Sequence, residues 1–348
     1  MIRVLIVDDS SSAALFLETV ICSDPDFRVI DRAKNGSDAV RMAKLLQPDI
    51  ITMDINMPGM DGFEATRQIM AETPCAIVIV SSIYNSQTVT LAFQAIEAGA
   101  LAIVSKPHSS NNHEGIAERQ ELLTTLKAMA NTKSRLRTRK TDPVCKSAPR
   151  PIIVSKPQEI RIIAIGASTG GPQAIQEILS GLPATVPVPI VIVQHISPGY
   201  EYGFAEWLNS SSELAVSIAT ADEMLRAGQV YLAPSGTHLE ITRFGKARLV
   251  SAPPENSVCP SVSRLFRSIA EAYRGNALGI ILSGMGVDGA AELAQLRELG
   301  AVTIAQDKES SVVHGMPGEA IRLGGGSHIL PAHDIAPLIR SLFDLNNN

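Results

Sequence analysis

The sequence predicts an α/β protein of two domains, each built on a mostly parallel sheet. Short apolar segments alternate with helical patterns from residue 1 to about residue 125, and the alternation resumes at residue 160. Between them, residues 126–159 are rich in prolines and basic residues with little periodicity, which is typical of a linker. A chain of 348 residues is also long enough for two domains. We therefore expect domains at 1–125 and 160–345.

The first domain is expected to contain five strands that alternate with helices. All but the second are rich in Ile and Val, as strands buried on both faces should be. Gly99 follows the helical pattern 87–98, where a C-cap glycine belongs. The repeats predict a parallel sheet with helices on both faces. The expected strands are 2–7, 28–32, 49–53, 76–81 and 101–105.

The second domain shows the same alternation and adds one hairpin. The segments 238–243 and 246–251 flank Phe244-Gly245, a pair that predicts a β-hairpin. The remaining apolar segments predict a mostly parallel sheet. Its expected strands are 161–166, 189–194, 229–233, 277–283 and 301–305.

Composition argues against several other classes of protein. A net charge of -5 gives no basis for nucleic-acid binding along the whole chain. No apolar run reaches the roughly 18 residues that span a bilayer, and Arg3, Asp8 and Asp9 interrupt any signal-peptide core. The 4 cysteines form no CxxC pair, so we predict neither a disulfide framework nor a zinc site. We expect a reduced cytoplasmic protein with no direct membrane insertion and no nucleic-acid partner.

Polar side chains stand where four strands of the first domain end. Asp8 and Asp9 end the first strand, Asp54 the third, Ser81 the fourth and Lys106 the fifth. Ligands of open parallel sheets gather beyond these carboxyl ends, so we expect the side chains to converge. Clustered carboxylates require a cation, and Mg²⁺ prefers oxygen ligands. A carboxylate in such a site is a plausible nucleophile toward a phosphoryl group, whose oxygens the hydroxyl and ammonium would hold.

These residues lie in the motifs VLIVDDS, MDINMPGMDG, VSS and SKP, through which residues 1–125 resemble a response-regulator receiver domain. The resemblance implies a flavodoxin-like (βα)5 fold and phosphorylation by a histidine kinase. Ile103 stands where many receivers carry an aromatic residue, so the aromatic part of the usual switch is altered. The implied site residues are the phosphoacceptor Asp54, the Mg²⁺ ligands Asp8, Asp9, Asp54 and the Asn56 carbonyl, the switch hydroxyl Ser81 and the phosphate-sensing Lys106.

A serine lies in a Gly-rich turn after the first strand of the second domain. The residues from Gly166 to Gly170 fit G-x-S-x-G, in which Ser168 sits on a sharp turn with its hydroxyl exposed. Backbone N–H groups at the start of the next helix favour developing negative charge. By itself the pattern is equally typical of a phosphate-binding loop, and a serine that only caps the helix is the commoner case.

A histidine and an aspartate are candidates to complete a nucleophilic site. A serine nucleophile needs a base within hydrogen-bond reach, and His195 directly follows a buried strand. His314 is the main rival, because its loop can reach the same edge. Asp288 is suited to orient a histidine, or else to cap the following helix.

The loop that carries Asp288 also permits a different interpretation. Gly284, Gly286 and Gly289 spell G-x-G-x-x-G, and Asp307 lies near the distance expected for a ribose-binding acid. A dinucleotide site is therefore an alternative. Such motifs usually open their domain, whereas this one lies late in the second domain.

The second domain is similar to the catalytic domain of the chemotaxis protein-glutamate methylesterase (CheB) family. The matching segments are IGASTGGPQAI, VQHISPGY, VYLAPSGTHLEI, CPSVSRLFRSIA, ILSGMGVDGA and AQDKESSVVHGMPGEAI. The resemblance implies a Rossmann-like fold, Ser168 as nucleophile, His195 as general base and Asp288 as its orienting acid. Thr169 and Met285 match positions that shape the site and stabilise the oxyanion.

The resemblance further implies what the protein acts on. Its substrates would be glutamate methyl esters on methyl-accepting chemoreceptors, together with glutamine amides that it would deamidate, and the esterase would need no cofactor. The unphosphorylated receiver is expected to restrict access until Asp54 is phosphorylated. Ser283 replaces an expected threonine, His314 stands where an aromatic residue is common, and the ending DLNNN lacks an aromatic receptor tether.

Three other functions remain as alternatives. One is a phosphorylation-regulated binding protein with an inactive hydrolase domain. The second is a nucleotide-binding oxidoreductase that uses the G-x-G-x-x-G loop. The third is a nucleic-acid output through the basic linker run of Lys133, Arg135, Arg137, Arg139 and Lys140.

Overall fold

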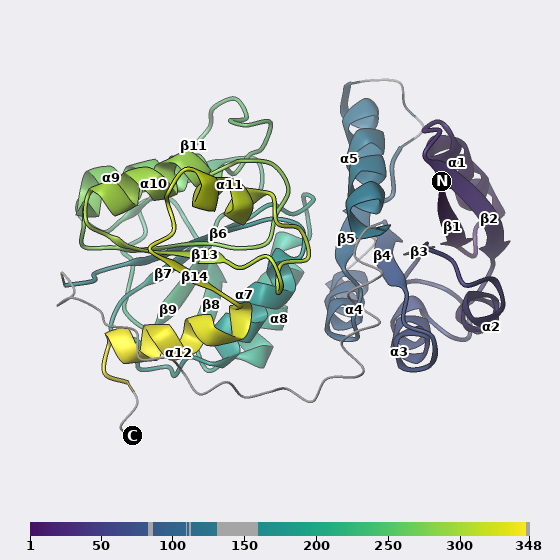
Figure 1. Cartoon of the computed structure of the whole chain (residues 1–348), viewed down its shortest axis with the longest axis horizontal. Helices are drawn as coiled ribbons and strands as arrows, with labels where there is room; N and C mark the ends of the chain where they lie inside the picture. The colour runs from purple at the N-terminus through teal and green to yellow at the C-terminus, as the bar shows by residue number, and fades with distance from the viewer. Residues whose placement is uncertain (83–85, 109, 111–112, 131–158, 346–348) are drawn as a thin grey trace. The chain divides into compact units, whose positions relative to one another are not determined.

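The computed structural model describes residues 1–82, 86–108, 110, 113–130 and 159–345 (Figure 1). The chain forms two compact units, Met1–Pro151 and Ile152–Asn348, and each is described here by itself. The basic run of the expected linker and the last residues of the chain lie outside the described residues.

The first unit contains one five-stranded parallel sheet, as predicted, and its strand order is β2-β1-β3-β4-β5. Helices cover both faces, with α1 against α5 on one face and α2, α3 and α4 in a row on the other. The strands are β1 (Ile2–Val7), β2 (Phe27–Ala33), β3 (Ile50–Met53), β4 (Ala76–Ser81) and β5 (Ala102–Ser105). The helices are α1 (Ser11–Cys22), α2 (Gly36–Leu46), α3 (Gly62–Glu72), α4 (Ser86–Glu97) and α5 (His113–Ala130).

Burial explains the strands of this unit and the length of its last helix. Every residue of β3 and β4 is buried, as their Ile- and Val-rich sequences require. Helix α5 continues to Ala130 rather than ending at residue 125, because Leu122, Leu126 and Met129 are fully buried at helical spacing. The predicted start of the linker at residue 126 is therefore too early.

The second unit contains a seven-stranded sheet with order β14-β13-β12-β6-β7-β9-β8, and all of its pairings are parallel. The strands are β6 (Ile163–Ala167), β7 (Ile190–Gln194), β8 (Ala215–Ile218), β9 (Gln229–Leu232), β12 (Leu278–Ile281), β13 (Val302–Gln306) and β14 (His328–Leu330). The helices are α7 (Gly171–Ser180), α8 (Glu201–Ser211), α9 (Val262–Tyr273), α10 (Ala290–Glu298), α11 (Met316–Arg322) and α12 (Ala332–Leu342).

Helices cover the two faces of this sheet in two groups. Helix α10 packs between α9 and α11 on one face, and α7 packs against α12 and α8 on the other (Figure 1). The predicted hairpin is present as β10 (His238–Ile241) and β11 (Ala247–Val250). Strands β8 and β14 were not expected, because both are short edge strands without a continuous apolar run.

The strand order determines where a ligand site can form. Strand β6 lies between β7 and β12, so the chain leaves β6 toward one side of the sheet and later returns on its other side. Such a reversal opens a crevice beyond the carboxyl ends of the central strands. The segments after β6, β7 and β12 carry Ser168, His195 and Asp288. None of the described helices is both long and apolar enough to cross a membrane.

Candidate active site and acidic pocket

Ser168 lies in the turn between β6 and α7, and the backbone around it is tightly held. Its N–H donates to the Ser283 carbonyl at 3.0 Å, and its carbonyl accepts from Gly171 N and Gln194 Nε2, each at 2.8 Å. Helix α7 has Gly170 as its N-cap, with φ 78° and no side-chain cap. Ser168 is therefore not the capping residue of this helix, and its side chain is not needed to start it.

His195 lies beside Ser168 because the two strands that precede them are neighbours. Ala167 pairs with Gln194 in parallel register, and the His195 N–H donates to the Ala167 carbonyl at 2.9 Å. The ring Nε2 lies 3.0 Å from Asp288 Oδ2. With Nε2 turned to the carboxylate, Nδ1 is the ring nitrogen left to accept a proton from the serine. Within the described residues, no hydrogen bond joins the Ser168 hydroxyl to the ring.

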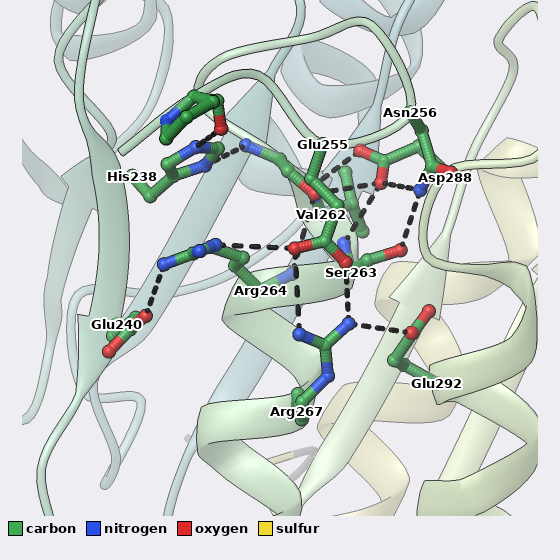
Figure 2. A network of polar contacts seen from close by, with 12 residues as sticks. His238, Glu240, Glu255, Asn256, Val262, Ser263, Arg264, Arg267, Asp288 and Glu292 are labelled. Carbon is green, nitrogen blue, oxygen red and sulfur yellow. Dashed lines mark hydrogen bonds and ion pairs between the residues drawn. The ribbon is translucent and has the colours of Figure 1, made fainter. Parts of the chain in front are cut away.

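Asp288 is buried, and both of its oxygens accept hydrogen bonds (Figure 2). The oxygen Oδ2 accepts from His195 Nε2 at 3.0 Å and from Val262 N at 2.6 Å. The oxygen Oδ1 accepts from Asn256 Nδ2 at 2.9 Å, Ser261 Oγ at 2.8 Å and Ser263 N at 3.2 Å. The carboxylate thus caps the N-terminus of α9 and not that of α10, whose N-cap is Gly289.

This environment keeps Asp288 ionised. Burial by itself raises the pKa of a carboxyl group, but hydrogen bonds from His195, Asn256 and Ser261 outweigh burial and hold the pKa of Asp288 well below its ordinary range. The N-terminus of α9 adds favourable electrostatics for a negative charge. A carboxylate that is ionised at neutral pH at this place can orient the His195 ring and stabilise its protonated form.

The Gly-rich loop after β12 packs directly on the serine. A Cβ on Gly284 would lie 2.8 Å from Ser168 Cβ and 2.3 Å from Met316 Sδ, so a side chain cannot be accommodated without movement. The Ser283 hydroxyl donates to the Thr169 carbonyl at 2.8 Å, which ties this loop to the turn of the serine. Packing against Ser168 thus accounts for Gly284 without the dinucleotide interpretation.

Thr169 follows the serine in the chain, and Met285 follows Gly284, the glycine that packs on the serine; both are half-buried. Their backbone N–H groups have no acceptor among the described residues. Free N–H groups beside a nucleophile are suited to stabilise an oxyanion. Both residues were singled out from the sequence for this region of the site.

The rival histidines have other partners or lie elsewhere. His314 pairs through its backbone with Gly284, but its Nδ1 lies 3.3 Å from the Ser311 hydroxyl. His238 is buried, where its Nδ1 accepts from Ser261 N at 3.2 Å. His328 lies on the edge strand β14 and His333 on α12, whereas His108 belongs to the first unit. The side chain of His113 lies outside the described residues. Sequence reasoning missed Asn256 and Ser261, although Ser261 precedes a helical pattern as an N-cap should.

The polar residues of the first unit converge at the carboxyl ends of β1 and β3. Asp8, Asp9 and Asp54 each offer an oxygen, and these atoms lie within 4.8 Å of one another. Lys106 Nζ lies 2.7 Å from Asp8 Oδ2 and 2.6 Å from Asp54 Oδ2. Burial raises the pKa of Asp54, although the bond from Lys106 opposes that shift. Burial alone would lower the pKa of Lys106, but its contacts with the two carboxylates raise it.

The donor set of this acidic pocket suits a hard cation. Asp8 Oδ2 is buried and makes no hydrogen bond, although it is paired with the Lys106 ammonium. The Asn56 side chain donates from Nδ2 to Thr88 Oγ1 at 2.9 Å, and the backbone carbonyl of Asn56 offers a further oxygen. Ser81 is fully buried at the end of β4, where its carbonyl accepts from Lys106 N at 3.1 Å. Carboxylate and carbonyl oxygens of this kind are ligands that Mg²⁺ accepts.

Comparison with known proteins gives the same two-part division. Residues 163–339 match the family described as CheB methylesterase, and residues 4–116 match the response regulator receiver domain. The chain is 46% identical over 346 residues to protein-glutamate methylesterase/protein-glutamine glutaminase 2 of Methanospirillum hungatei, covering 98% of each. A like-named protein of Syntrophus aciditrophicus is 44% identical, also over 98% of each chain. The Thermotoga maritima CheB methylesterase catalytic domain superposes with a TM-score of 0.51 at 38% identity, over 53% of this chain and 100% of that one.

Proposed function

The chain belongs to the CheB methylesterase family, and from this premise we propose that it is a phosphorylation-activated protein-glutamate methylesterase and protein-glutamine glutaminase. The observation that carries the proposal is the hydrogen bond between His195 and the buried Asp288, directly beside Ser168 at the edge where ligands of parallel sheets bind. These three groups are the nucleophile, base and acid that ester hydrolysis requires.

In the first half of the proposed cycle, Ser168 Oγ attacks the carbonyl carbon of the glutamate methyl ester. His195 takes the serine proton at Nδ1, and the Asp288 carboxylate stabilises the imidazolium that forms. The tetrahedral intermediate collapses when the proton passes from His195 to the methoxy oxygen. Methanol leaves, and the glutamyl group remains as an ester of Ser168. With a glutamine substrate, ammonia leaves in the same step.

In the second half, water attacks the acyl-enzyme with His195 again as the base. The Glu side chain is released, and the proton returns to the Ser168 oxygen. In both halves, the N–H groups of Thr169 and Met285 stabilise the negative oxygen, aided by the N-terminus of α7. This chemistry requires only groups of the chain and water, so we propose no cofactor for the esterase.

Regulation is proposed to act through Asp54 of the first unit. Its carboxylate attacks the phosphorus of a phosphohistidine on the kinase. The P–N bond breaks with the kinase histidine as the leaving group, and an acyl phosphate forms on Asp54. Asp8, Asp9, Asp54 and the Asn56 carbonyl would hold Mg²⁺, which when bound neutralises phosphoryl oxygens. Lys106 pairs with the new phosphoryl group, and the Ser81 hydroxyl donates to it. The acyl phosphate raises esterase activity.

The setting that follows from this proposal is a chemosensory two-component pathway in the cytoplasm, with methyl-accepting chemoreceptors as substrates. The alternative of a regulated binding protein with an inactive hydrolase domain is not favoured, because relatives that match nearly the whole chain are named as the enzyme. The ionised Asp288 beside His195 also argues for a working site.

One experiment tests both activity and regulation. Wild type and Asp54→Asn are incubated with methylated receptor fragments, with and without acetyl phosphate and Mg²⁺, and methanol is measured. A second set of fragments with glutamine at the same sites is assayed for ammonia. We expect wild type to release both products and to respond to the phosphodonor, whereas Asp54→Asn keeps only the unstimulated rate. No product from wild type on any fragment would contradict the proposed enzyme.

A further inference from the structure

Asp288 Oδ1, the oxygen that does not face His195, is held by residues to which no role in the reaction has been given. Two of its three donors are side chains, Asn256 Nδ2 at 2.9 Å and Ser261 Oγ at 2.8 Å. Both come from the segment 253–261, which leads from the β10–β11 hairpin to α9. We call this segment the acid loop, because it surrounds the carboxylate (Figure 2).

The acid loop is held in a conformation that aims Asn256 at the carboxylate. Asn256 and Ser257 have φ angles of 53° and 66°, in the left-handed region that few side chains adopt. The preceding residue, Glu255, is paired with both Arg264 and Arg267 of α9. Arg267 also pairs with Glu292 of α10. The pairs of Glu255 anchor the loop to α9 at the point where the backbone takes the unfavourable angles, and Arg267 in turn ties α9 to α10.

His238 holds the two ends of the acid loop together. Its Nδ1 accepts from Ser261 N at 3.2 Å, and its Nε2 lies 3.1 Å from the Pro253 carbonyl. Because an N–H faces Nδ1 and a carbonyl faces Nε2, the ring is neutral with its hydrogen on Nε2. The ring is fully buried, so water cannot replace either contact. One side chain thus fixes the distance between the start of the loop and the cap of α9.

We propose that Asn256 and Ser261 are positioning residues that orient the Asp288 carboxylate toward His195, and that His238 clamps the loop that carries them. This inference rests on the proposed function of the triad. Besides His195, the backbone N–H groups of Val262 and Ser263 also donate to the carboxylate, but the shortest bond to Oδ1 comes from a side chain, Ser261 Oγ. Loss of the two side-chain donors leaves Oδ1 with only the 3.2 Å bond from Ser263 N, so the carboxylate can rotate more freely about its last bond. With Oδ1 held by donors of the acid loop, Oδ2 stays aimed at His195 Nε2. The ring then keeps its hydrogen on Nε2 and presents Nδ1 as the base.

The test uses glycine variants of the full-length chain. Asn256→Gly removes the amide and suits the left-handed backbone. Ser261→Gly removes the hydroxyl but keeps a favoured N-cap residue for α9. Ser261→Thr restores a hydroxyl and serves as the conservative rescue. The matched control is Asn209→Ala on α8, which removes a hydrogen bond that Val216 N donates to Asn209 Oδ1 at 3.0 Å.

Two readouts are measured besides thermal stability. One is kcat and KM for methanol release. The other is the ¹H NMR signal of the His195 ring N–H, assigned by its loss in His195→Gln. We expect kcat to fall roughly tenfold to a hundredfold in the glycine variants with KM unchanged, because the lost bonds go to a charged group. Ser261→Gly should have the larger effect, since Ser261 is buried and Asn256 is exposed. The NMR signal should shift or broaden.

The outcomes separate this inference from the function on which it rests. Ser261→Thr and Asn209→Ala should retain wild-type kcat and the wild-type signal. Unchanged kcat or an unchanged His195 signal in both glycine variants would overturn the positioning role. If wild type shows no esterase activity, the proposed function fails, and the NMR signal alone still decides whether the acid loop orients Asp288.

Discussion

Replacing Asp288 with asparagine changes one atom of the side chain and removes its charge. Every group that faces the carboxylate is a hydrogen-bond donor, and an amide offers one acceptor oxygen and one NH₂. If the NH₂ takes the place of Oδ2, it faces His195 Nε2 and Val262 N. If it takes the place of Oδ1, it faces Asn256, Ser261 and Ser263. Either orientation leaves at least two donors without an acceptor.

The magnitude follows from these contacts. The orientation with the NH₂ in place of Oδ2 leaves fewer donors unpaired, two rather than three. In that orientation Nε2 loses its acceptor and the wrong tautomer of His195 becomes possible, which in serine hydrolases of this type costs about ten-thousandfold in kcat. Two buried donors without acceptors cost about 3 kcal/mol of the free energy of unfolding. The folded-state pKa of Asp288 is lowered, so its contribution to stability is present above the unfolded pKa and is lost as the pH falls below that value. Asp288→Asn has no carboxyl group at this position, so its free energy of unfolding should not show this decrease at acid pH.

The assay compares methanol release and urea unfolding of wild type and Asp288→Asn at pH 7 and at acid pH. The matched control is Asp307→Asn. There, Asp307 Oδ1 alone accepts from the Ser310 N–H and hydroxyl, so the amide oxygen can replace it. We expect the control to keep wild-type kcat. A kcat of Asp288→Asn within tenfold of wild type would refute the role of this carboxylate in orienting His195.

Three further predictions follow from the packing and the charges. Gly284→Ala should lower kcat about a hundredfold in the methanol assay, because the new methyl group displaces Ser168, while phosphorylation of Asp54 by acetyl phosphate stays normal. Asp54→Asn should abolish phosphorylation, measured by incorporation from a labelled phosphodonor, and leave unstimulated activity intact. Lys106→Met should lower the free energy of unfolding in urea by about 3 kcal/mol at pH 8, because the buried carboxylates of Asp8 and Asp54 lose their cation. This decrease in the free energy of unfolding should be smaller at pH 5, because the pKa of Asp54 is raised, and smaller at pH 8 when Mg²⁺ is added. Equal decreases at pH 8, at pH 5 and with Mg²⁺ would contradict this account.

Most of the fold follows from burial patterns that the sequence displays. Strands buried on both faces, such as β4, require continuous apolar runs, so they are visible without a structure. Strand β8 was missed because its side chains alternate between exposed and half-buried, at the edge of the sheet. The predicted linker begins at residue 126, inside α5, where Leu126 and Met129 are buried at helical spacing. Their apolar spacing covers only the last turns of the helix and is followed at once by the basic run of the linker.

The candidate site was predictable to the extent that it depends on strand ends. Ser168 and His195 directly follow strands, so parallel pairing brings them together. Asp288 lies farther along its loop, and its choice as the acid came from the family resemblance. The acid loop was not predictable, because Asn256 and Ser261 reach Asp288 only through left-handed backbone angles and ion pairs between distant elements. Such geometry leaves no periodic signal in the sequence.

The most direct measurement is methanol release from a methylated receptor fragment by wild type and Ser168→Ala, with acetyl phosphate and Mg²⁺ present. The serine side chain caps no helix, so the variant should fold like wild type, and circular dichroism checks this. The account predicts that wild type releases methanol and that folded Ser168→Ala loses at least about a thousandfold of this rate. A folded Ser168→Ala that releases methanol at the wild-type rate would contradict Ser168 as the nucleophile and, with it, the proposed mechanism.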